Sequence, residues 1–307
     1  RSSPHSSKSR AVSSSSQRKG RLCPREVMVI IMKLRYLGTA AAEGVPALFC
    51  ECENCKKSRA AGGRAIRTRS QALVDGQLLI DFPADTYKHI LDNNINLCKI
   101  SHCLITHTHS DHLYPNDLAM LEPGYSHLPD GYKLHIYGSD AVCSRLGQTV
   151  ERLKRHNICE LHEVKPFDKF SADGYEVTAL PAIHDKNAGP LFYMISRCGK
   201  TLLWAHDTHY FSDEVWDYFA DTKPRFDLVS LDCTNACLPL TYIGHMGLAE
   251  NIKAKEKLIS LGCADDGTVF VCNHFSHNGT NVVYDDFVPI AGRAGFKVSF
   301  DGGEFEV

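Results

Sequence analysis

The segment His107-Thr108-His109-Ser110-Asp111-His112 constrains this chain more than any other feature of its sequence. It directly follows His102–Thr106, a short apolar run that predicts a buried strand. Side chains able to bind a metal therefore leave one strand end together and can converge on a small volume. Neutral imidazole is a common ligand for Zn²⁺, Mn²⁺ and iron, and a carboxylate suits harder ions. The alternative is a solvated polar loop, which does not require so dense a pattern, so the sequence predicts a metal site.

After Lys33 the chain alternates short apolar runs with turn signals. The predicted strands cover residues 33–37, 71–74, 78–81, 102–106, 133–137, 161–164, 175–180, 191–196, 201–205, 227–231, 268–272, 296–300 and 304–307. Helices are predicted over 85–93 and 247–261, with Gly262 where a C-terminal cap would fall. Asp75-Gly76, Cys198-Gly199 and Asp301-Gly302-Gly303 predict three hairpins. This order indicates mixed sheets covered by helices.

The N-terminal segment differs in composition from the rest of the chain. Residues 1–31 are rich in Ser and Arg, and we predict a disordered basic tail there, followed by one domain over 32–307. A remnant or a mitochondrial transit peptide stays an alternative for the tail. The whole chain has a formal net charge of -2, so the part after the tail is acidic and lacks the basic surface of a general nucleic-acid binder.

The chain has 13 cysteines, an odd number, and no secretory signal. This favours a reducing compartment, and so a cytoplasmic location, over a disulfide framework. The apolar run Val27–Met32 is too short to span a bilayer, and we expect no membrane partner.

A second cluster, Cys50-Glu51-Cys52-Glu53-Asn54-Cys55, places three thiols in six residues. Three thiolates and one imidazole make a closed tetrahedral zinc site, which is structural. His277, three residues after His274, is the candidate for the fourth ligand. Three buried thiols without a metal are the alternative.

The His107–His112 segment resembles the signature of the metallo-β-lactamase superfamily. This resemblance implies an α/β (α+β) fold, a four-layered αβ/βα sandwich of two mixed β-sheets flanked by helices, with the site at the sheet edges. It also implies three further ligands downstream, and His184, Asp207 and His274 each follow a predicted strand. One metal is then expected on His107, His109 and His184, and a second on Asp111, His112 and His274, with Asp207 bridging both. Asp81 resembles the superfamily's first motif, whose carboxylate supports the site from outside the ligands.

Two such ions, about 3.5–4 Å apart, lower the pKa of a bridging water toward neutrality and polarise a phosphoryl or carbonyl oxygen. We expect two divalent catalytic metals, Mn²⁺ or Zn²⁺, with Fe²⁺ as a third option, because all three accept these ligands. One structural zinc is expected in addition.

The pairing of the cysteine cluster with His274 and His277 resembles the PhnP-type phosphodiesterases, which hydrolyse phosphoribosyl cyclic phosphate. It implies hydrolysis of a small cyclic phosphodiester, phosphoribosyl 1,2-cyclic phosphate, by a metal-bridging hydroxide. The catalytic residues would be His245, Asp111 and Asp207. His245 stands before a predicted helix in Gly244-His245-Met246, where the family implies a proton donor or a phosphate contact. A histidine that merely precedes a helix is the alternative.

Other functions stay open at this point. They are tRNA 3′-end processing, lactone or thioester hydrolysis, and a non-catalytic cofactor-biosynthesis relative. We expect a small phosphorylated substrate, no nucleic-acid partner, and leave homodimer formation open. Arg67 and Arg69 are interpreted as part of a solvated basic turn, and His206 and His209 have no place in the pattern.

Overall fold

The structure is a computed structural model that describes residues 31–239 and 243–307. Residues 31–307 form one compact unit. The predicted tail falls, except for Ile31, outside the described residues. Within the described ranges, no helix has the length and apolar character needed to span a membrane. The cytoplasmic location stays a prediction.

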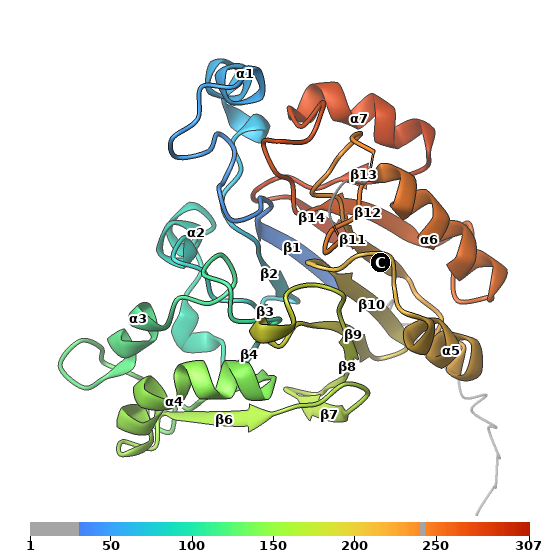
Figure 1. Ribbon diagram of the computed structural model, residues 1–307. Coiled ribbons are helices and arrows are strands. Elements are labelled where there is room, and N and C mark those ends of the chain that lie inside the picture. The colour runs from blue at the N-terminus through green and yellow to red at the C-terminus, as the bar shows by residue number, and fades with distance from the viewer. Residues whose placement is uncertain (1–30, 240–242) are drawn as a thin grey trace, which may run out of the picture. The chain divides into compact units, whose positions relative to one another are not determined.

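Two seven-stranded mixed sheets form the centre of the fold (Figure 1). In sheet order, the first consists of β14 (Glu304–Glu306), β1 (Lys33–Gly38), β2 (Gln71–Val74), β3 (Leu78–Ile80), β4 (His102–Leu104), β5 (Leu134–Gly138) and β6 (Cys159–Glu163). The second consists of β13 (Lys297–Val298), β12 (Val269–Asn273), β11 (Leu228–Asp232), β10 (Lys200–Ala205), β9 (Leu191–Arg197), β8 (Tyr175–Pro181) and β7 (Lys169–Ala172).

Helices cover the outer faces of the sheets (Figure 1). The α-helices of the described ranges are α1 (Glu53–Ala61), α2 (Thr86–Asp92), α3 (Pro115–Leu118), α4 (Asp140–Lys154), α5 (Asp213–Thr222), α6 (Leu248–Ser260) and α7 (Tyr284–Arg293). The helix α4 packs on the first sheet, because Val142, Leu146, Val150 and Leu153 recur at helical spacing and are all buried. The helices α5, α6 and α7 pack on the second sheet.

Three apolar cores separate four layers. One lies between the sheets and contains Tyr36 and Trp204, whose rings are 5.7 Å apart. The other two lie between each sheet and its helices. All five residues of β11 are buried, because this strand is covered on both faces. The predicted four-layered sandwich is therefore confirmed.

The predicted C-terminal hairpin is wrong. The strand β13 pairs in parallel with β12 in the second sheet, whereas β14 pairs antiparallel with β1 in the first. The chain crosses between the sheets at Asp301, whose half-buried carboxylate accepts hydrogen bonds from the hydroxyls of Thr39 (2.6 Å) and Thr68 (2.5 Å). These bonds hold the crossover beside the first sheet, so each strand completes a different sheet edge.

Strand direction brings particular chain segments to one edge of each sheet. In the first sheet β3 and β4 run parallel. In the second, β10, β11 and β12 run parallel, and β8 has the same direction because β8–β9 and β9–β10 are both antiparallel. The residues that follow these strands therefore gather where the strands end.

Candidate metal centre

Polar side chains follow five of these strands. Asp81 comes after β3, His107 after β4, His184 after β8, Asp207 after β10 and His274 after β12. Asp81, Asp207 and His274 have positive φ angles of 67°, 49° and 64°. Non-glycine residues adopt this left-handed conformation at an energetic cost, which concentrates at functional sites. The strained strand ends thus mark this edge as a candidate site.

One group of predicted ligands consists of His107, His109 and His184, whose ligand atoms all lie within 4.8 Å of one another. His109 Nδ1 lies 3.1 Å from His184 Nε2. The residues come from both sheets, because His107 and His109 follow β4 whereas His184 follows β8.

A second group consists of Asp111, His112 and His274, again within 4.8 Å. His112 Nε2 lies 3.2 Å from Asp111 Oδ2 and 3.3 Å from His274 Nε2. Asp207 lies between the groups: its Oδ2 is 2.6 Å from His112 Nε2, and its Oδ1 is 3.7 Å from His184 Nε2. The structure thus brings all seven predicted ligands together, and their assignment to two ions stays a prediction.

These residues fit a pair of metal ions. His107 is 1% exposed, and its Nε2 has no hydrogen-bond partner among the described residues. Leaving such a group unsatisfied costs about 1–3 kcal/mol. A cation bound through the nitrogen lone pair would remove this cost, and imidazole with carboxylate is a ligand set that zinc, manganese and iron accept.

The electrostatics of the cluster agree with this fit. Burial alone would lower the pKa of His112, but Asp207, Asp111 and Asp81 outweigh it and raise this pKa well above its ordinary value. The pKa of His274 is raised to about 10, against the effect of burial, mainly by Asp207. The ionised carboxylates thus favour positive charge at this point, and a bound divalent cation would displace the protons.

Asp81 and Thr234 contact the outer nitrogens of two imidazoles. Asp81 Oδ2 lies 2.7 Å from His112 Nδ1, and its Oδ1 accepts hydrogen bonds from the backbone and hydroxyl of Thr106. Thr234 Oγ1 lies 2.9 Å from His274 Nδ1. Such contacts fix which ring nitrogen faces the metal. The supporting role of Asp81 stays a prediction.

Sequence reasoning missed Asp232, the last residue of β11. It is fully buried and accepts backbone N–H bonds from Asp207 (3.0 Å), Thr234 (3.0 Å) and Met246 (3.1 Å). Its Oδ2 also lies 3.0 Å from His245 Nδ1. A signal was present in the sequence. Asp232 comes directly after the apolar run of residues 227–231, much as Asp81 and Asp207 stand at the ends of their own apolar runs.

His245 lies beside the metal centre. Its Nδ1 is 3.6 Å from Asp207 Oδ1 and 3.2 Å from Thr234 Oγ1. Burial would lower the pKa of His245, but Asp232 and then Asp207 raise it above its ordinary value. The histidine is therefore held between two carboxylates at the edge of the cluster.

The structure also places the unassigned residues. His206 is buried, with Nε2 2.8 Å from Ser230 Oγ and its ring 4.0 Å from that of Trp204. His209 Nδ1 lies 3.3 Å from the carbonyl oxygen of His245. The interpretation of Arg67 as solvated is wrong: it is 2% exposed, stacks on Phe275 and donates to Thr39 and Ser299.

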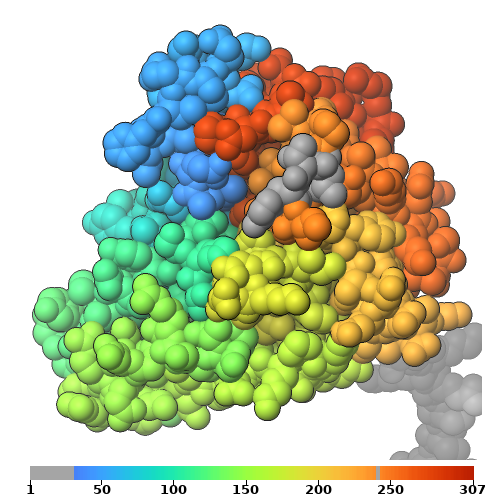
Figure 2. Space-filling view, viewed as in Figure 1, coloured from blue at the N-terminus to red at the C-terminus, as the bar shows by residue number. Residues whose placement is uncertain are grey.

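The cysteine cluster meets His277 as the sequence predicted. The ligand atoms of Cys50, Cys52, Cys55 and His277 lie within 4.8 Å of one another, and His277 Nδ1 is 3.3 Å from Cys50 Sγ and 3.5 Å from Cys52 Sγ. Burial raises the pKa of the Cys55 thiol to about 11, whereas the pKa of Cys52 is lowered to about 6, against burial, by His277 and neighbouring donors. This set could hold a further metal ion. Figure 2 shows the blue segment that contains the cysteines against the orange and red C-terminal segments.

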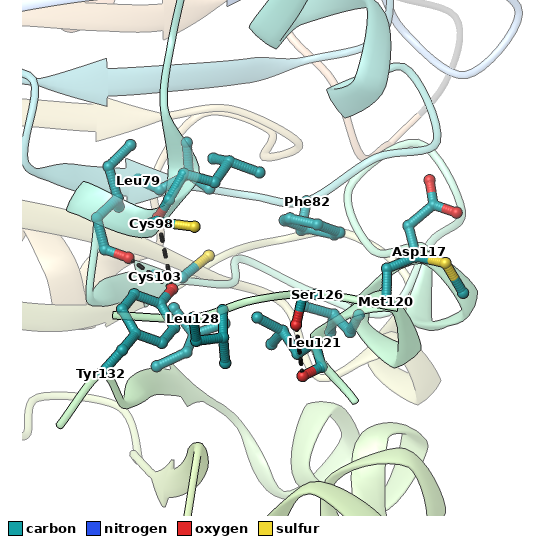
Figure 3. Close-up of a pocket in the computed structure, with 14 residues that line it drawn as sticks. Leu79, Phe82, Cys98, Cys103, Asp117, Met120, Leu121, Ser126, Leu128 and Tyr132 are labelled. Carbon is teal, nitrogen blue, oxygen red and sulfur yellow. Dashed lines mark hydrogen bonds between the residues drawn. The ribbon is translucent and has the colours of Figure 1, made fainter. Parts of the chain in front are cut away.

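Two cavities are relevant to ligand binding. A cavity of about 390 Å³ opens onto the metal centre, and its other lining residues are Ala41, Ala42, Glu43, Thr234, Asn235, His245, Ser276 and Asn278. Another, of about 180 Å³, lies beneath the first sheet and is almost entirely apolar; Figure 3 shows Leu79, Phe82 and Leu128 in its lining. None of its described lining residues is a histidine. The polar cavity at the metal centre is thus the candidate active site.

Comparison with known proteins agrees with this geometry. Residues 80–260 match the family described as the Beta-lactamase superfamily domain, and the chain belongs to this superfamily. The fold and the buried His/Asp cluster define a metal-dependent hydrolase of the metallo-β-lactamase fold. A comparison with curated protein sequences finds no match.

Solved structures share the fold over nearly their whole lengths. A diphosphatase from the PhnP family is 22% identical, with a TM-score of 0.68, over 91% of this chain and 98% of that one. Zn²⁺-bound PqqB from Methylobacterium extorquens is 19% identical, with a TM-score of 0.68, over 90% and 100%. The short form of human tRNase Z is 17% identical, with a TM-score of 0.61, over 89% and 98%.

Proposed function

We propose that this protein is a dinuclear metal-dependent phosphodiesterase that hydrolyses a small cyclic phosphodiester, with phosphoribosyl 1,2-cyclic phosphate as the first candidate substrate. The observation that carries this proposal is the convergence of the six other predicted ligand side chains around Asp207, whose two carboxylate oxygens face different groups. The similarity to a PhnP-family diphosphatase supports hydrolysis at phosphorus. The intact ligand set argues against a non-catalytic relative.

Each part of the centre has a task in this proposal. His107, His109 and His184 would hold one ion, Asp111, His112 and His274 the other, and Asp207 both. When bound, the ions lower the pKa of a water molecule and stabilise negative charge on the phosphoryl oxygens. The four residues Cys50, Cys52, Cys55 and His277 would hold a structural zinc, which fixes α1 against the loop after β12.

His245 would donate a proton to the leaving oxygen. It lines the cavity beside the metal centre, and Asp232 holds its Nδ1. Water attacks phosphorus and releases a proton to solvent, the P–O bond to the leaving group breaks, and the alkoxide takes a proton from the His245 imidazolium, which solvent then protonates again. Asp232 would act as a positioning residue, because its contact with the ring is also tied to the backbone of Asp207 and Met246.

Turnover by the metal-loaded full chain tests the proposal. The substrates are bis(p-nitrophenyl) phosphate, phosphoribosyl 1,2-cyclic phosphate, a tRNA with a 3′ trailer and a panel of lactones. We expect phosphodiester hydrolysis that falls more than roughly 100-fold in Asp111→Ala. Activity on lactones alone would reject the assignment, and activity on the tRNA alone would replace it with 3′-end processing.

The role of His245 has its own test. His245→Ala should slow hydrolysis of an alkyl phosphodiester by roughly 10²–10⁴-fold, with unchanged metal content. In the same variant, the release of p-nitrophenolate from bis(p-nitrophenyl) phosphate should slow much less, because this leaving group needs no proton. His127→Ala, at an exposed histidine, is the matched control. Loss of metal from His245→Ala would assign the residue to the metal centre instead.

A further inference from the structure

The cavity at the metal centre has a polar wall formed by Glu43, Asn235, Ser276 and Asn278. None of these residues belongs to the predicted metal ligands. We call this set the polar wall. Its side chains can contact the part of a substrate that does not react.

Neighbouring groups hold Glu43 in place. Its Oε1 accepts hydrogen bonds from Ser276 Oγ (2.7 Å) and Asn278 Nδ2 (3.3 Å), and lies 3.6 Å from His277 Nε2. Since His277 also contacts Cys50 and Cys52, the carboxylate is tied to the cysteine cluster. Its Oε2 has no hydrogen-bond or ion-pair partner among the described residues. This oxygen can accept a hydrogen bond from a substrate hydroxyl.

Asn235 supplies the complementary donor. Its Nδ2 is buried, and it has no hydrogen-bond partner within residues 31–239 and 243–307. A buried amide donor is costly unless it is paired. Because Asn235 lines the cavity, a substrate oxygen there would satisfy it. The polar wall thus offers both an acceptor and a donor, the pair that a hydroxyl group needs.

The polar wall has no positive charge. No Lys or Arg occurs among the described residues that line the cavity. Arg67 is turned into the core, and Arg69 pairs with Asp85 at 3.1 Å and donates to the carbonyl oxygen of Ala42. Residues 240–242 are Leu, Thr and Tyr, so their sequence adds no basic side chain. A second phosphate near the polar wall would meet the carboxylate of Glu43, and no Lys or Arg among the described lining residues would offset that repulsion.

We propose that the polar wall binds the uncharged, hydroxyl-bearing part of the substrate. The protein then selects phosphodiesters that carry a single negative charge, such as the cyclic phosphate of an unphosphorylated pentose, over those with a second phosphate. This proposal rests on the proposed phosphodiesterase function but replaces its first candidate substrate, since phosphoribosyl 1,2-cyclic phosphate carries such a second phosphate and the cyclic phosphate of the unphosphorylated pentose does not.

The test compares ribose 1,2-cyclic phosphate with its 5-phosphate, using the metal-loaded full chain. We expect kcat/KM to favour the unphosphorylated substrate at least about 10-fold. Glu43→Gln should reduce this preference, because the amide keeps an acceptor oxygen but loses the charge. Asn235→Ala should raise KM for the ribose substrate. Glu256→Gln, at an exposed acid on α6, is the matched control.

Bis(p-nitrophenyl) phosphate separates specificity from damage, because it has no hydroxyl for the polar wall to bind. In Asn235→Ala, kcat/KM should fall further for the ribose substrate than for bis(p-nitrophenyl) phosphate. The metal content of Glu43→Gln shows whether the contact between Glu43 and His277 has been disturbed. A preference for the 5-phosphate, retained in Glu43→Gln, would overturn the proposal while leaving the phosphodiesterase intact.

A binding measurement tests the polar wall without turnover. Calorimetry with ribose 1-phosphate and ribose 1,5-bisphosphate should show tighter binding of the monophosphate, although the bisphosphate carries more charge toward the metal ions. Equal or tighter binding of the bisphosphate overturns the inference. If no phosphodiester is hydrolysed, the proposed function fails, and this binding order still decides the inference.

Discussion

Four imidazoles of the metal centre have one ring nitrogen engaged by a group outside the cluster. Asp81 contacts His112, Thr234 contacts His274, the carbonyl oxygen of Gly244 accepts from His184, and Asp185 lies 3.5 Å from His109. The other ring nitrogen of each of these imidazoles therefore points toward the predicted metal site before any ion binds. Loss of such an outer contact typically weakens metal binding roughly 10–100-fold. At the scale of residues, these outer contacts orient the predicted ligands in advance.

The contact between Asp81 and His112 gives a direct prediction. In Asp81→Ala, His112 Nδ1 loses its acceptor, so the ring can turn and its Nε2 is no longer directed at Asp111 and Asp207. We expect the dissociation constant for the metals to rise roughly 10–100-fold. Competition with a chelator and elemental analysis measure this. Asp130→Ala, in an exposed loop, should bind metal as the parent does; equal affinity in both variants would contradict the supporting role.

A buried histidine outside the site controls stability at mildly acidic pH. His89 is 1% exposed; it contacts Gln71 through Nδ1 (2.6 Å) and Thr68 through Nε2 (2.7 Å). Burial lowers the pKa of His89 to about 4, although Asp85 and Asp92 oppose the shift. Because the unfolded chain binds the proton more tightly, His89 stabilises the fold above pH 6.5, and this contribution is lost as the pH falls toward 4.

We expect this loss to reach about 2 kcal/mol between pH 7 and pH 5. Urea unfolding of the parent and of His89→Gln at both pH values measures it. The stability difference between the two proteins should shrink by that amount on acidification, since glutamine does not titrate. A difference that stays constant with pH would mean that His89 titrates normally in the folded chain.

At the scale of elements, the sequence predicted the parts of the site that follow from local pattern. The ligands His184, Asp207 and His274 come after strands whose apolar runs are visible in the sequence, so their common edge could be inferred. The pairing of the C-terminal strands could not be inferred from the sequence, because the turn at Asp301-Gly302-Gly303 does not reveal which sheet edge has room for a further strand. The helix α4 was missed although its apolar spacing was present.

The short helix α1 depends on the cysteine cluster. Cys52 is its N-cap, with the backbone N–H of Cys55 donating to Sγ at 3.5 Å, and Asn54 donates to the carbonyl oxygens of His277 and Gly279. Cys52→Ala removes both a cap and a thiolate. We expect one zinc fewer per chain and a Tm lower by roughly 5–10 °C, with some hydrolysis retained. Cys143→Ala, in the first turn of α4, is the matched control for loss of a thiol. Unchanged zinc content in Cys52→Ala would favour three thiols without a metal.

At the scale of the whole molecule, the metal centre joins the two sheets. His107, His109, Asp111 and His112 follow β4 of the first sheet, whereas His184, Asp207 and His274 follow strands of the second. The inter-sheet core holds the sheets through apolar contacts, including Tyr36 with Trp204. At the site edge, by contrast, ionised carboxylates and imidazoles face each other across the boundary. A cation bound there links the sheets by the same contacts that would serve catalysis.

Removal of the metals should therefore loosen both sheets at this edge. Each ion present at 100 times its dissociation constant stabilises the folded chain by about 2.7 kcal/mol, so chelation of two should lower Tm by roughly 10–20 °C. Hydrogen exchange should rise in the segment after β4 and in those after β8, β10 and β12 together, and return with added Zn²⁺ or Mn²⁺. In Asp207→Asn, renewed addition of metal should restore little of the protection from hydrogen exchange, because the negative charge of Asp207 between the two ligand groups is absent. Faster exchange after β4 alone would mean that the second sheet holds no metal, and the shared centre would then be wrong.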